Sequence, residues 1–567
     1  MQKSAGLLVL WFIVSAGAAF AAGHTADVTL RGPEDRRLLK RLDVSVESVT
    51  GGVARVWLDD REDAALRAAG LPVRLTTDGA LSRGARGYHT PEQCVADFQA
   101  WAAAHPEVCR LTEIGKSVEG RPILSLKITT DPDQHGFKPA VRICGAHHGN
   151  EVMSCETVIL FTKYLLDNYK TDAKLGGLVR DREIHIIPMV NPDGVSKLTR
   201  HNANDVDLNR NYGYNWAGGT KSGEVPYSEP EVRAIRDHAM QHAFSSSLSF
   251  HCSGNIINTV WNYTPVRVPD NEVIQEISQG YAAFNQYSVT VGWDWYETHG
   301  DTDDFSYGCR GDLDWTIEVE NPDDSGIAAV FAKNRDAIVY FLEQAGRGIC
   351  GTVTDAATGK PLEAMVEPMP TGWPCFTDPA GGDFHRVIKP GTYALRVWAP
   401  GHEAKVVENV VVPASGAVRV DVALAAAPEY HALNVATTVI PNEDDYHNKT
   451  HAPHALGPAD GRFVSLAKGG YIVLDLGAAF PAGKPGTVSV TEATCDTPES
   501  CAVATSTDLA GPWTDLGTVR GTGAVPAAVV QRYLRIADSP TRVPSEGDPT
   551  TTPGYDLDAV TVVPSAR

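Results

Sequence analysis

The chain has 567 residues and a formal net charge of −21, and 43% of its residues are hydrophobic. This length is too great for one hydrophobic core and predicts about three or four domains, while the hydrophobic content excludes a chain that is disordered as a whole. The negative charge argues against nucleic acid as a partner and favours the approach of cationic peptides.

The first residues predict a leader for export. Lys3 precedes a short apolar run that ends in the letters AFA, a signal-peptide pattern with cleavage after Ala21, so that residues 1–21 are removed. The run is too short for a permanent anchor, and no later stretch reaches about 18 apolar residues. We therefore expect a secreted or periplasmic protein with no stable membrane anchor.

Residues 22–86 read as strand, helix, strands, helix and strand, which predicts a small α+β module. Leu38, Leu39 and Leu42 have helical spacing, and Leu66 supports the second helix. The linker LSRGARG that follows is polar and glycine-rich, and it offers Arg83 to a trypsin-like protease, as it does Arg86. Activation by cleavage at this linker is one hypothesis, and a permanent structural domain is the other.

The letters GAHHGNE hold the most informative pair of residues, His148 and Glu151. A strand-to-helix turn can aim this imidazole and this carboxylate at one metal ion. Zinc that catalyses hydrolysis usually takes three protein ligands and keeps one position open for water. His251, which follows the predicted strand SSLSF, is the candidate third ligand. Alone, a His-x-x-Glu pair is more often a helix surface or a satisfied polar contact.

Further segments follow in an order that suits one zinc site, namely RHNANDVDLNRNYGYNW, PYSEPE, WYETHGDTDD and DWTIEVE. Together these letters resemble the zinc metallocarboxypeptidases over residues 88–346. The motif RxNANxVDLNRN is closer to the regulatory branch, with carboxypeptidases N, E, D and M, than to the pancreatic digestive enzymes. The resemblance implies an α/β fold class: an α/β/α domain with a twisted mixed sheet over residues 87–347, which cleaves single residues from peptide C-termini.

The resemblance also implies a zinc site and its general base. The implied zinc ligands are His148, Glu151 and His251. Glu318 would take a proton from the attacking water and hand it to the leaving amine. Glu320, on the same face of the strand, is the rival base. His147 competes as a ligand, but the third residue after it is Asn150, a poor zinc ligand, so we interpret His147 as structural.

Four more residues resemble the family's substrate-binding set. Arg200 would stabilise the oxyanion, and Tyr296 would close over the bound terminus. Asn209 and Arg210 would grip the terminal carboxylate of the substrate, which a guanidinium can bind through two hydrogen bonds. In isolation, Arg210 would more simply be a surface arginine.

Specificity depends on a single acid. Counted from Tyr296, Asp303 falls where the family places the floor of the pocket for the last side chain of the substrate, and an acid there resembles the digestive enzymes that remove Lys or Arg. The regulatory branch instead carries an acid shortly after the third zinc ligand, where this chain has Asn262. A buried carboxylate would favour a cationic guest. The alternative is a solvated loop acid.

Two β regions follow the implied catalytic domain. Residues 348–425, with the TGKP turn, resemble the transthyretin-like β-sandwich of the regulatory branch. Residues 426–567 resemble the galactose-binding-like jelly rolls of secreted bacterial proteins, with a carbohydrate or surface ligand as a possible partner. Asp548, Asp556 and Asp558 could hold Ca²⁺, although solvated turn acids are the simpler interpretation. We interpret His447, His451 and His454 as part of a linker.

Ten cysteines agree with an oxidising compartment. Their order suggests bonds between neighbours, although connectivity does not follow from sequence. The suggested pairs are Cys94 with Cys109, Cys144 with Cys155, Cys252 with Cys309, Cys350 with Cys375, and Cys495 with Cys501. A zinc role for Cys144 or Cys252 is the alternative.

Three functions fit these observations. The first is an exported zinc carboxypeptidase that removes C-terminal residues, preferably basic ones, from peptides or proteins. The second is the same mechanism on cell-wall peptides. The third is a surface-binding protein with an inert carboxypeptidase domain, but such a relative should lack a zinc ligand or the base, and this chain has all four residues. The sequence leaves the oligomeric state open.

Overall fold

The computed structural model describes residues 24–42, 44–76, 87–370, 372–440, 452–467, 469–493, 499–539 and 555–565. The predicted signal peptide and the linker arginines, Arg83 and Arg86, lie outside these residues. The chain divides into two compact units: Met1–Val46 with Thr50–Thr77, and Glu47–Val49 with Asp78–Arg567.

The N-terminal part contains a four-stranded sheet in the order β2-β3-β1-β4. Its elements are β1 (His24–Thr29), α1 (Pro33–Arg41), β2 (Ser45–Thr50), β3 (Val53–Leu58), α2 (Asp60–Ala68) and β4 (Val73–Leu75). Leu39 and Leu66 are buried, as the helical spacing predicts. Asp59 begins α2 with a capping box, in which its carboxylate accepts from Glu62 N and the Glu62 carboxylate accepts from Asp59 N. The order of elements is the predicted one.

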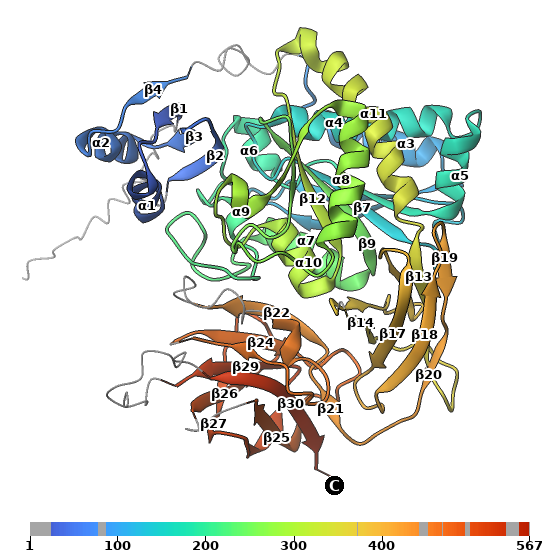
Figure 1. Ribbon diagram of the computed structural model, residues 1–567. Helices are drawn as coiled ribbons and strands as arrows, with labels where there is room; N and C mark the ends of the chain where they lie inside the picture. Colours follow the sequence, from blue (N-terminus) through green and yellow to red (C-terminus); the bar gives the residue numbers. More distant parts are fainter. Residues whose placement is uncertain are drawn as a thin grey trace, which may run out of the picture. The chain divides into compact units, whose positions relative to one another are not determined.

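An eight-stranded mixed sheet forms the centre of the larger unit, in the order β11-β10-β12-β9-β7-β8-β6-β5 (Figure 1). Its strands are β5 (Cys109–Lys116), β6 (Pro122–Ile128), β7 (Ala140–Gly145), β8 (Glu183–Ile187), β9 (Phe244–Cys252), β10 (Ile256–Thr259), β11 (Ser288–Val291) and β12 (Leu313–Val319). The central strands β8, β7, β9 and β12 run parallel to one another, whereas β6 and β10 are antiparallel to their inner neighbours. Every residue of β7 is buried, as expected for a parallel strand with both faces covered.

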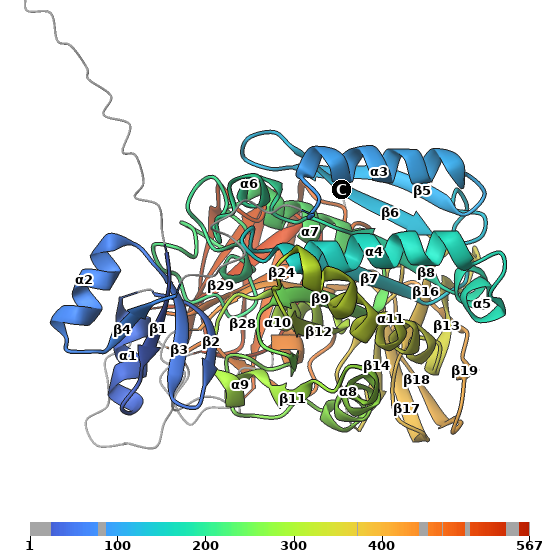
Figure 2. The ribbon, with the colours of Figure 1, turned by 90° about the horizontal axis from the view of Figure 1, so that it is seen from above.

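Helices cover both faces of this sheet (Figure 2). They are α3 (Pro91–Ala104), α4 (Val152–Asn168), α5 (Ala173–Asp181), α6 (Pro192–Lys197), α7 (Pro230–Gln241), α8 (Asn271–Asn285), α9 (Gly292–Trp295), α10 (Thr302–Arg310) and α11 (Ile327–Gln344). On β7, Gly145 faces α4, where a Cβ atom would lie 2.9 Å from Cys155 Cα. Arg142, three residues earlier and so on the other face, donates to Ser306 of α10. The predicted α/β class with a mixed sheet is confirmed.

Two sheets follow between residues 348 and 424, in the orders β16-β13-β19, with β20 beside β13, and β15-β14-β17-β18. Their strands are β13 (Gly348–Asp355), β14 (Met365–Met369), β15 (Cys375–Phe376), β16 (Asp383–Arg386), β17 (Gly391–Trp398), β18 (Lys405–Val412), β19 (Ala417–Arg419) and β20 (Val422–Leu424). Ile349 and Val353 of β13 share one hydrophobic core with Val366 of β14 and Leu395 of β17. The two sheets therefore pack face to face.

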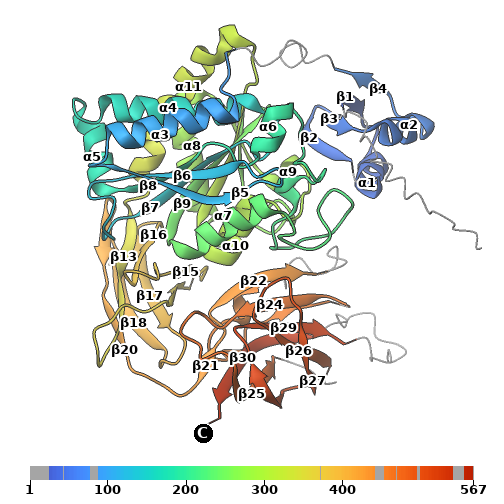
Figure 3. The same ribbon diagram turned by 180° about the vertical axis from the view of Figure 1, so that it is seen from behind.

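The last part of the chain contains two more sheets, in the orders β21-β30-β25-β28, with β23 beside β30, and β22-β24-β29-β26-β27 (Figure 3). Their strands are β21 (Tyr430–His431), β22 (Asn434–Val439), β23 (Val464–Ser465), β24 (Tyr471–Asp475), β25 (Lys484–Glu492), β26 (Ser500–Ser506), β27 (Thr514–Arg520), β28 (Gly523–Val530), β29 (Tyr533–Asp538) and β30 (Asp556–Pro564). The prediction of all-β structure after the catalytic sheet is confirmed.

Both β regions bond to the catalytic part of the chain through buried groups. Trp373 Nε1 donates to the carbonyl oxygen of Tyr307 at 2.7 Å. Arg310 of α10 donates to Asn434 Oδ1 at 2.8 Å, and Tyr227 Oη donates to a carbonyl oxygen of β22. These bonds hold α10, the helix that carries Asp303, against both β regions.

The predicted disulfide pairs among the described cysteines are wrong. All nine described cysteines are free thiols, and Cys495, the partner suggested for Cys501, lies outside the described residues. Cys144 and Cys155 show the physical reason. Gly145 faces Cys155 across the sheet surface, so its neighbour Cys144 points to the opposite face and cannot reach it.

In the described part of the chain, no helix is long and apolar enough to cross a membrane.

Candidate functional site

The predicted zinc ligands come together where neighbouring parallel strands end. β7 leads into the turn with His148, and Glu151 is the last residue before α4. His251 is the penultimate residue of β9 and pairs in register with Glu318 of β12. The carboxyl ends of parallel strands meet at one edge of a sheet, where α/β proteins usually bind ligands.

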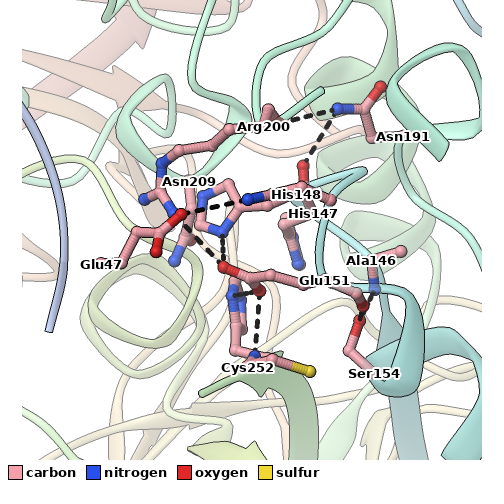
Figure 4. A network of polar contacts seen from close by, with 12 residues as sticks. Glu47, Ala146, His147, His148, Glu151, Ser154, Asn191, Arg200, Asn209 and Cys252 are labelled. Carbon is pink, nitrogen blue, oxygen red and sulfur yellow. Dashed lines mark hydrogen bonds and ion pairs between the residues drawn. The ribbon is translucent and has the colours of Figure 1, made fainter. Parts of the chain in front are cut away.

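The three side chains converge within a buried cluster, and Figure 4 shows two of them, His148 and Glu151. His148 Nδ1 lies 2.7 Å from Glu151 Oε1, and His251 Nδ1 lies 2.9 Å from Glu151 Oε2. One potential ligand atom from each residue lies within 4.8 Å of the others. Two imidazoles and one carboxylate are the donor set of many hydrolytic zinc sites. The predicted metal site is therefore brought together by the fold.

Asp207 holds the His148 ring from behind. His148 Nε2 lies 2.9 Å from Asp207 Oδ1, while Nδ1 faces the cluster, so a metal ion on Nδ1 would leave the proton on Nε2. A carboxylate in this position is typical of zinc-binding histidines, because it fixes the ring and its tautomer. The residues present thus fit zinc, which His148, Glu151 and His251 would hold.

Protonation of His148 competes with metal binding. Burial alone would lower the pKa of His148, but the carboxylates of Glu151 and Asp207 outweigh burial and raise it. The two histidines in turn lower the pKa of Glu151, against the effect of its burial. In the metal-free protein, the raised pKa keeps a proton on His148 at a higher pH than on an ordinary histidine.

We therefore predict that the zinc affinity begins to fall on acidification at a pH above 6.5, the ordinary value for histidine. A metal ligand must be deprotonated, so the binding constant should drop by about tenfold per pH unit below the pKa of His148. Competition with a chromogenic chelator between about pH 5.5 and 8.5 measures this constant. A constant that stays level down to pH 5.5, after correction for the chelator, would contradict the prediction.

Arg200 lies directly beside the cluster and is fully buried. Its Nε and Nη2 atoms pair with Asp207 Oδ2 at 3.1 and 3.0 Å, and Nη1 lies 3.3 Å from Glu151 Oε1. Asp207 thus fixes the guanidinium through one edge. Arg200 also lines the pocket that contains the cluster.

Asn209 and Arg210 belong to the short 3₁₀ helix η2 (Leu208–Arg210) and line the same pocket. Asn209 Oδ1 accepts from Thr302 N at 2.9 Å, and Arg210 Nη1 donates to the carbonyl oxygen of Asn209 at 2.7 Å. Tyr296, which is half-buried, lines the pocket too, and burial raises the pKa of its hydroxyl to about 12. All predicted substrate-binding residues therefore border one pocket.

Glu318 faces this pocket, whereas Glu320 has other partners. Glu318 is buried, and its Oε2 atom has no hydrogen-bond partner among the described residues. Burial raises the pKa of Glu318 well above its ordinary value, and the charge of Glu151 adds to this effect. Glu320 instead accepts from Tyr287 Oη and pairs with Lys333. This contrast favours Glu318 over its rival as the base.

Asp303 lies at the buried end of the pocket, on the first turn of α10. Asn262 Nδ2 donates to Asp303 Oδ2 at 3.0 Å, so the two positions considered for specificity are in direct contact. Burial raises the pKa of Asp303 well above its ordinary value, and the nearby carboxylates of Asp301 and Asp314 raise it further. The alternative of a solvated loop acid is wrong, because Asp303 is only 1% exposed.

His147 does not join the cluster. Its Nε2 atom lies 2.9 Å from Tyr212 Oη, and its ring stacks on the His251 ring with centroids 5.4 Å apart. This packing agrees with the structural role inferred from the sequence.

Sequence reasoning missed two acids of the site. Asp207 supports both His148 and Arg200, and Asp301 lines the pocket, where it accepts from Thr298 Oγ1 at 2.6 Å. The position of Asp207 inside the VDLNRN segment was a usable signal, since Asn209 and Arg210 of the same segment received roles. The capping position of Asp301 before α10 gave no comparable signal.

The described residues give the predicted calcium site no support. Asp548 lies outside them, and the Asp558 carboxylate accepts from the backbone nitrogens of Asp460 and Gly461, each at 3.1 Å. Asp558 therefore holds the turn at residues 460–461 from within β30, and it is buried, unlike the solvated acid that the simpler interpretation expected. His447 and His451 also lie outside the described residues.

Comparison with known proteins agrees with this site. Residues 94–344 match the family model of the zinc carboxypeptidases. Carboxypeptidase D of Mus musculus is 29% identical over 375 residues, which cover 59% of this chain and 27% of that protein. The carboxypeptidase N catalytic chain of Mus musculus is 28% identical over 365 residues, which cover 54% of this chain and 80% of that protein. The match thus spans about a quarter of carboxypeptidase D.

Among solved structures, carboxypeptidase A from Helicoverpa armigera aligns with a TM-score of 0.49 and 21% sequence identity, covering 57% of this chain and 97% of that one. The family match and the regulatory-branch relatives agree with the resemblance inferred from the motifs. Over residues 94–344, this chain is similar to the zinc carboxypeptidases.

Proposed function

We propose that this chain is an exported zinc carboxypeptidase that removes single residues, preferably Lys or Arg, from the C-termini of peptides and proteins. The observation that carries the proposal is one pocket that contains the His148, Glu151 and His251 cluster, the buried Asp303, and Glu318, whose Oε2 atom has no hydrogen-bond partner among the described residues. Export is supported by the signal-peptide pattern of residues 1–21.

When bound, zinc would lower the pKa of water toward about 7 and polarise the scissile carbonyl. Glu318 takes a proton from the attacking water and passes it to the leaving amine. Arg200 donates a hydrogen bond to the oxyanion, a contribution of about 3 kcal/mol in other hydrolases. Its ion pairs with Asp207 keep the guanidinium in place while the charge develops.

Exopeptidase action follows from the charged and polar side chains that meet the terminal carboxylate of the substrate in the pocket. Arg210 presents a guanidinium to the terminal carboxylate, and the neighbouring Asn209 amide adds a hydrogen-bond donor. Tyr296, half-buried beside them, closes over the bound terminus. A substrate without a terminal carboxylate leaves these buried polar groups unpaired, which is costly.

Preference for basic residues follows from Asp303. Its carboxylate lies in a low-dielectric site beside Asp301, and both acids line the pocket. A cationic side chain relieves the repulsion between these acids, whereas an apolar side chain leaves it unchanged.

The proposal is tested with two peptides of one sequence ending in Arg, one with a free C-terminal carboxylate and one with an amide. We expect Arg to be released from the free acid with a kcat/KM at least about 30 times that for the amide, because removing one partner from a buried charge pair costs about 2–5 kcal/mol. Equal cleavage of both peptides would contradict carboxylate recognition. Internal cleavage of the amide would indicate an endopeptidase instead.

A further inference from the structure

Three histidines gather at a second place in the larger unit, away from the residues that line the zinc pocket. His185 is on β8, His238 is on the last turn of α7, and His242 follows that helix directly. One ring nitrogen from each lies within 4.8 Å of the others. We call these residues the trihistidine cluster.

The groups around the cluster accept hydrogen bonds, which leaves lone pairs inside it. His185 Nε2 lies 2.8 Å from Glu183 Oε1, so this nitrogen carries the proton and Nδ1 has a lone pair. That Nδ1 lies 3.2 Å from His238 Nε2, which is also 3.2 Å from Ser125 Oγ. His238 Nδ1 is buried and has no hydrogen-bond partner in the described part of the chain. Hydrogen bonds alone therefore leave the cluster unsatisfied.

His185 and His238 lie in surroundings that disfavour their protonation. Burial lowers the pKa of His185 well below its ordinary value, and so does the neighbouring His242. Burial and then His185 lower the pKa of His238 in the same way. Phe244 packs against all three rings, with ring centroids 5.2 to 5.6 Å apart. The rings are therefore fixed in a largely dry environment.

Two cations lie near the cluster, but each has acidic partners. Lys127 Nζ lies 3.5 Å from Glu183 Oε2, the carboxylate that supports His185. Arg142, a residue of β7, pairs with Asp314 at 3.1 Å. These ion pairs reduce the repulsion that a bound cation would meet.

We propose that the trihistidine cluster is a second metal site, which binds Zn²⁺ through His185, His238 and His242. Nitrogen ligands at about 2.0–2.1 Å from a tetrahedral zinc ion lie about 3.3–3.4 Å apart, close to the 3.2 Å between His185 and His238. The carboxylate behind His185 repeats the arrangement of Asp207 behind His148. Three imidazoles suit Zn²⁺ and would leave its fourth position to water on the half-buried side of His242.

This site also adjoins the first β region. Asp378, between β15 and β16, has its Oδ2 atom 3.8 Å from His242 Nδ1 and is buried. At this distance Asp378 forms no direct hydrogen bond with His242, but its carboxylate adds negative charge beside the cluster. Zinc at the cluster would join β8 to the end of α7, so its expected role is in stability and not in peptide cleavage.

The test is a count of zinc per chain in the purified full-length protein. The protein is stripped with a chelator, reloaded with excess ZnCl₂, gel-filtered and analysed by elemental mass spectrometry. We expect two zinc ions in the unaltered protein, one in His185→Gln, one in His148→Gln and none in the double variant. The unrelated His105→Gln, a half-buried histidine outside both clusters, should keep two.

The number of zinc ions per chain in these variants decides whether the second site exists. One zinc in the unaltered protein together with none in His148→Gln would overturn it, as would two zinc ions in His185→Gln. If circular dichroism shows that His185→Gln does not fold, His242→Gln is used instead, because His242 is only half-buried. The expected count is again one zinc ion per chain. Replacement with Co²⁺ gives a second readout, because a tetrahedral second site should add visible absorption that survives in His148→Gln. The result is independent of peptidase activity, so failure here and failure of the proposed function are distinguishable.

Discussion

Replacing Glu318 with glutamine is expected to lower kcat for peptide hydrolysis by about 10²–10⁴-fold, the usual contribution of a general acid–base group. Glutamine keeps the shape of the side chain but cannot take a proton from water. Glu318 pairs in register with His251, and its Oε2 atom has no competing partner among the described residues. Zinc content should stay unchanged, because Glu318 is not one of the inferred ligands. The measurement is kcat on an Arg-ended peptide together with zinc analysis of the same sample.

The matched control is Glu320→Gln, which removes the same charge directly after the same strand. Glu320 is bound to Tyr287 and Lys333, so its loss should change kcat by less than about tenfold, although stability could fall. Near-normal kcat in Glu318→Gln with a large loss in Glu320→Gln would reverse the assignment of the base.

Replacing Asp303 with asparagine is expected to lower the kcat/KM ratio between Arg-ended and Phe-ended peptides by about 30-fold or more. This factor corresponds to the lower end, about 2 kcal/mol, of the cost of removing one partner from a buried charge pair. Asparagine keeps the volume and can still bond to Asn262, so the pocket should keep its shape. The change should come from slower Arg release and not from faster Phe release.

Asp294→Asn is the control for this experiment. Asp294 lies on α9 in the same acid-rich stretch, but it is exposed and pairs with Arg267. Its loss alters net charge equally and should leave the Arg to Phe ratio unchanged within about twofold, as surface ion pairs contribute little. An unchanged ratio in Asp303→Asn would remove Asp303 from the specificity pocket.

Much of the site could be predicted from sequence, because its residues occur in short, distinctive segments. His148 and Glu151 are three positions apart, and the turn between β7 and α4 fixes their relation. From the sequence, Glu318 could be chosen over Glu320 only because it fits the motif of the family. The structure supplies the physical reason, because the two carboxylates differ in their hydrogen-bond partners.

Other features depend on which strands and helices become neighbours in the fold, and the local sequence does not determine this packing. His185 and His238 are 53 positions apart and meet only because α7 packs near β8. The cysteine pairs were wrong for the same reason: Cys144 and Cys155 are close along the chain but face opposite sides of β7. Alternation of apolar residues predicted sheets in the last third of the chain, but not the order β22-β24-β29-β26-β27.

The most direct test of zinc-dependent removal of C-terminal residues is a competition assay on the purified mature protein. Matched peptides ending in Arg, Lys, Phe and Leu are mixed, and release is followed with and without a zinc chelator. We predict release of Arg and Lys ahead of Phe and Leu, its loss in chelator and its return with added Zn²⁺. Release that persists after zinc has been removed, verified by metal analysis, or no release of any residue by zinc-loaded protein even after cleavage at the Arg83 to Arg86 linker, would contradict the account.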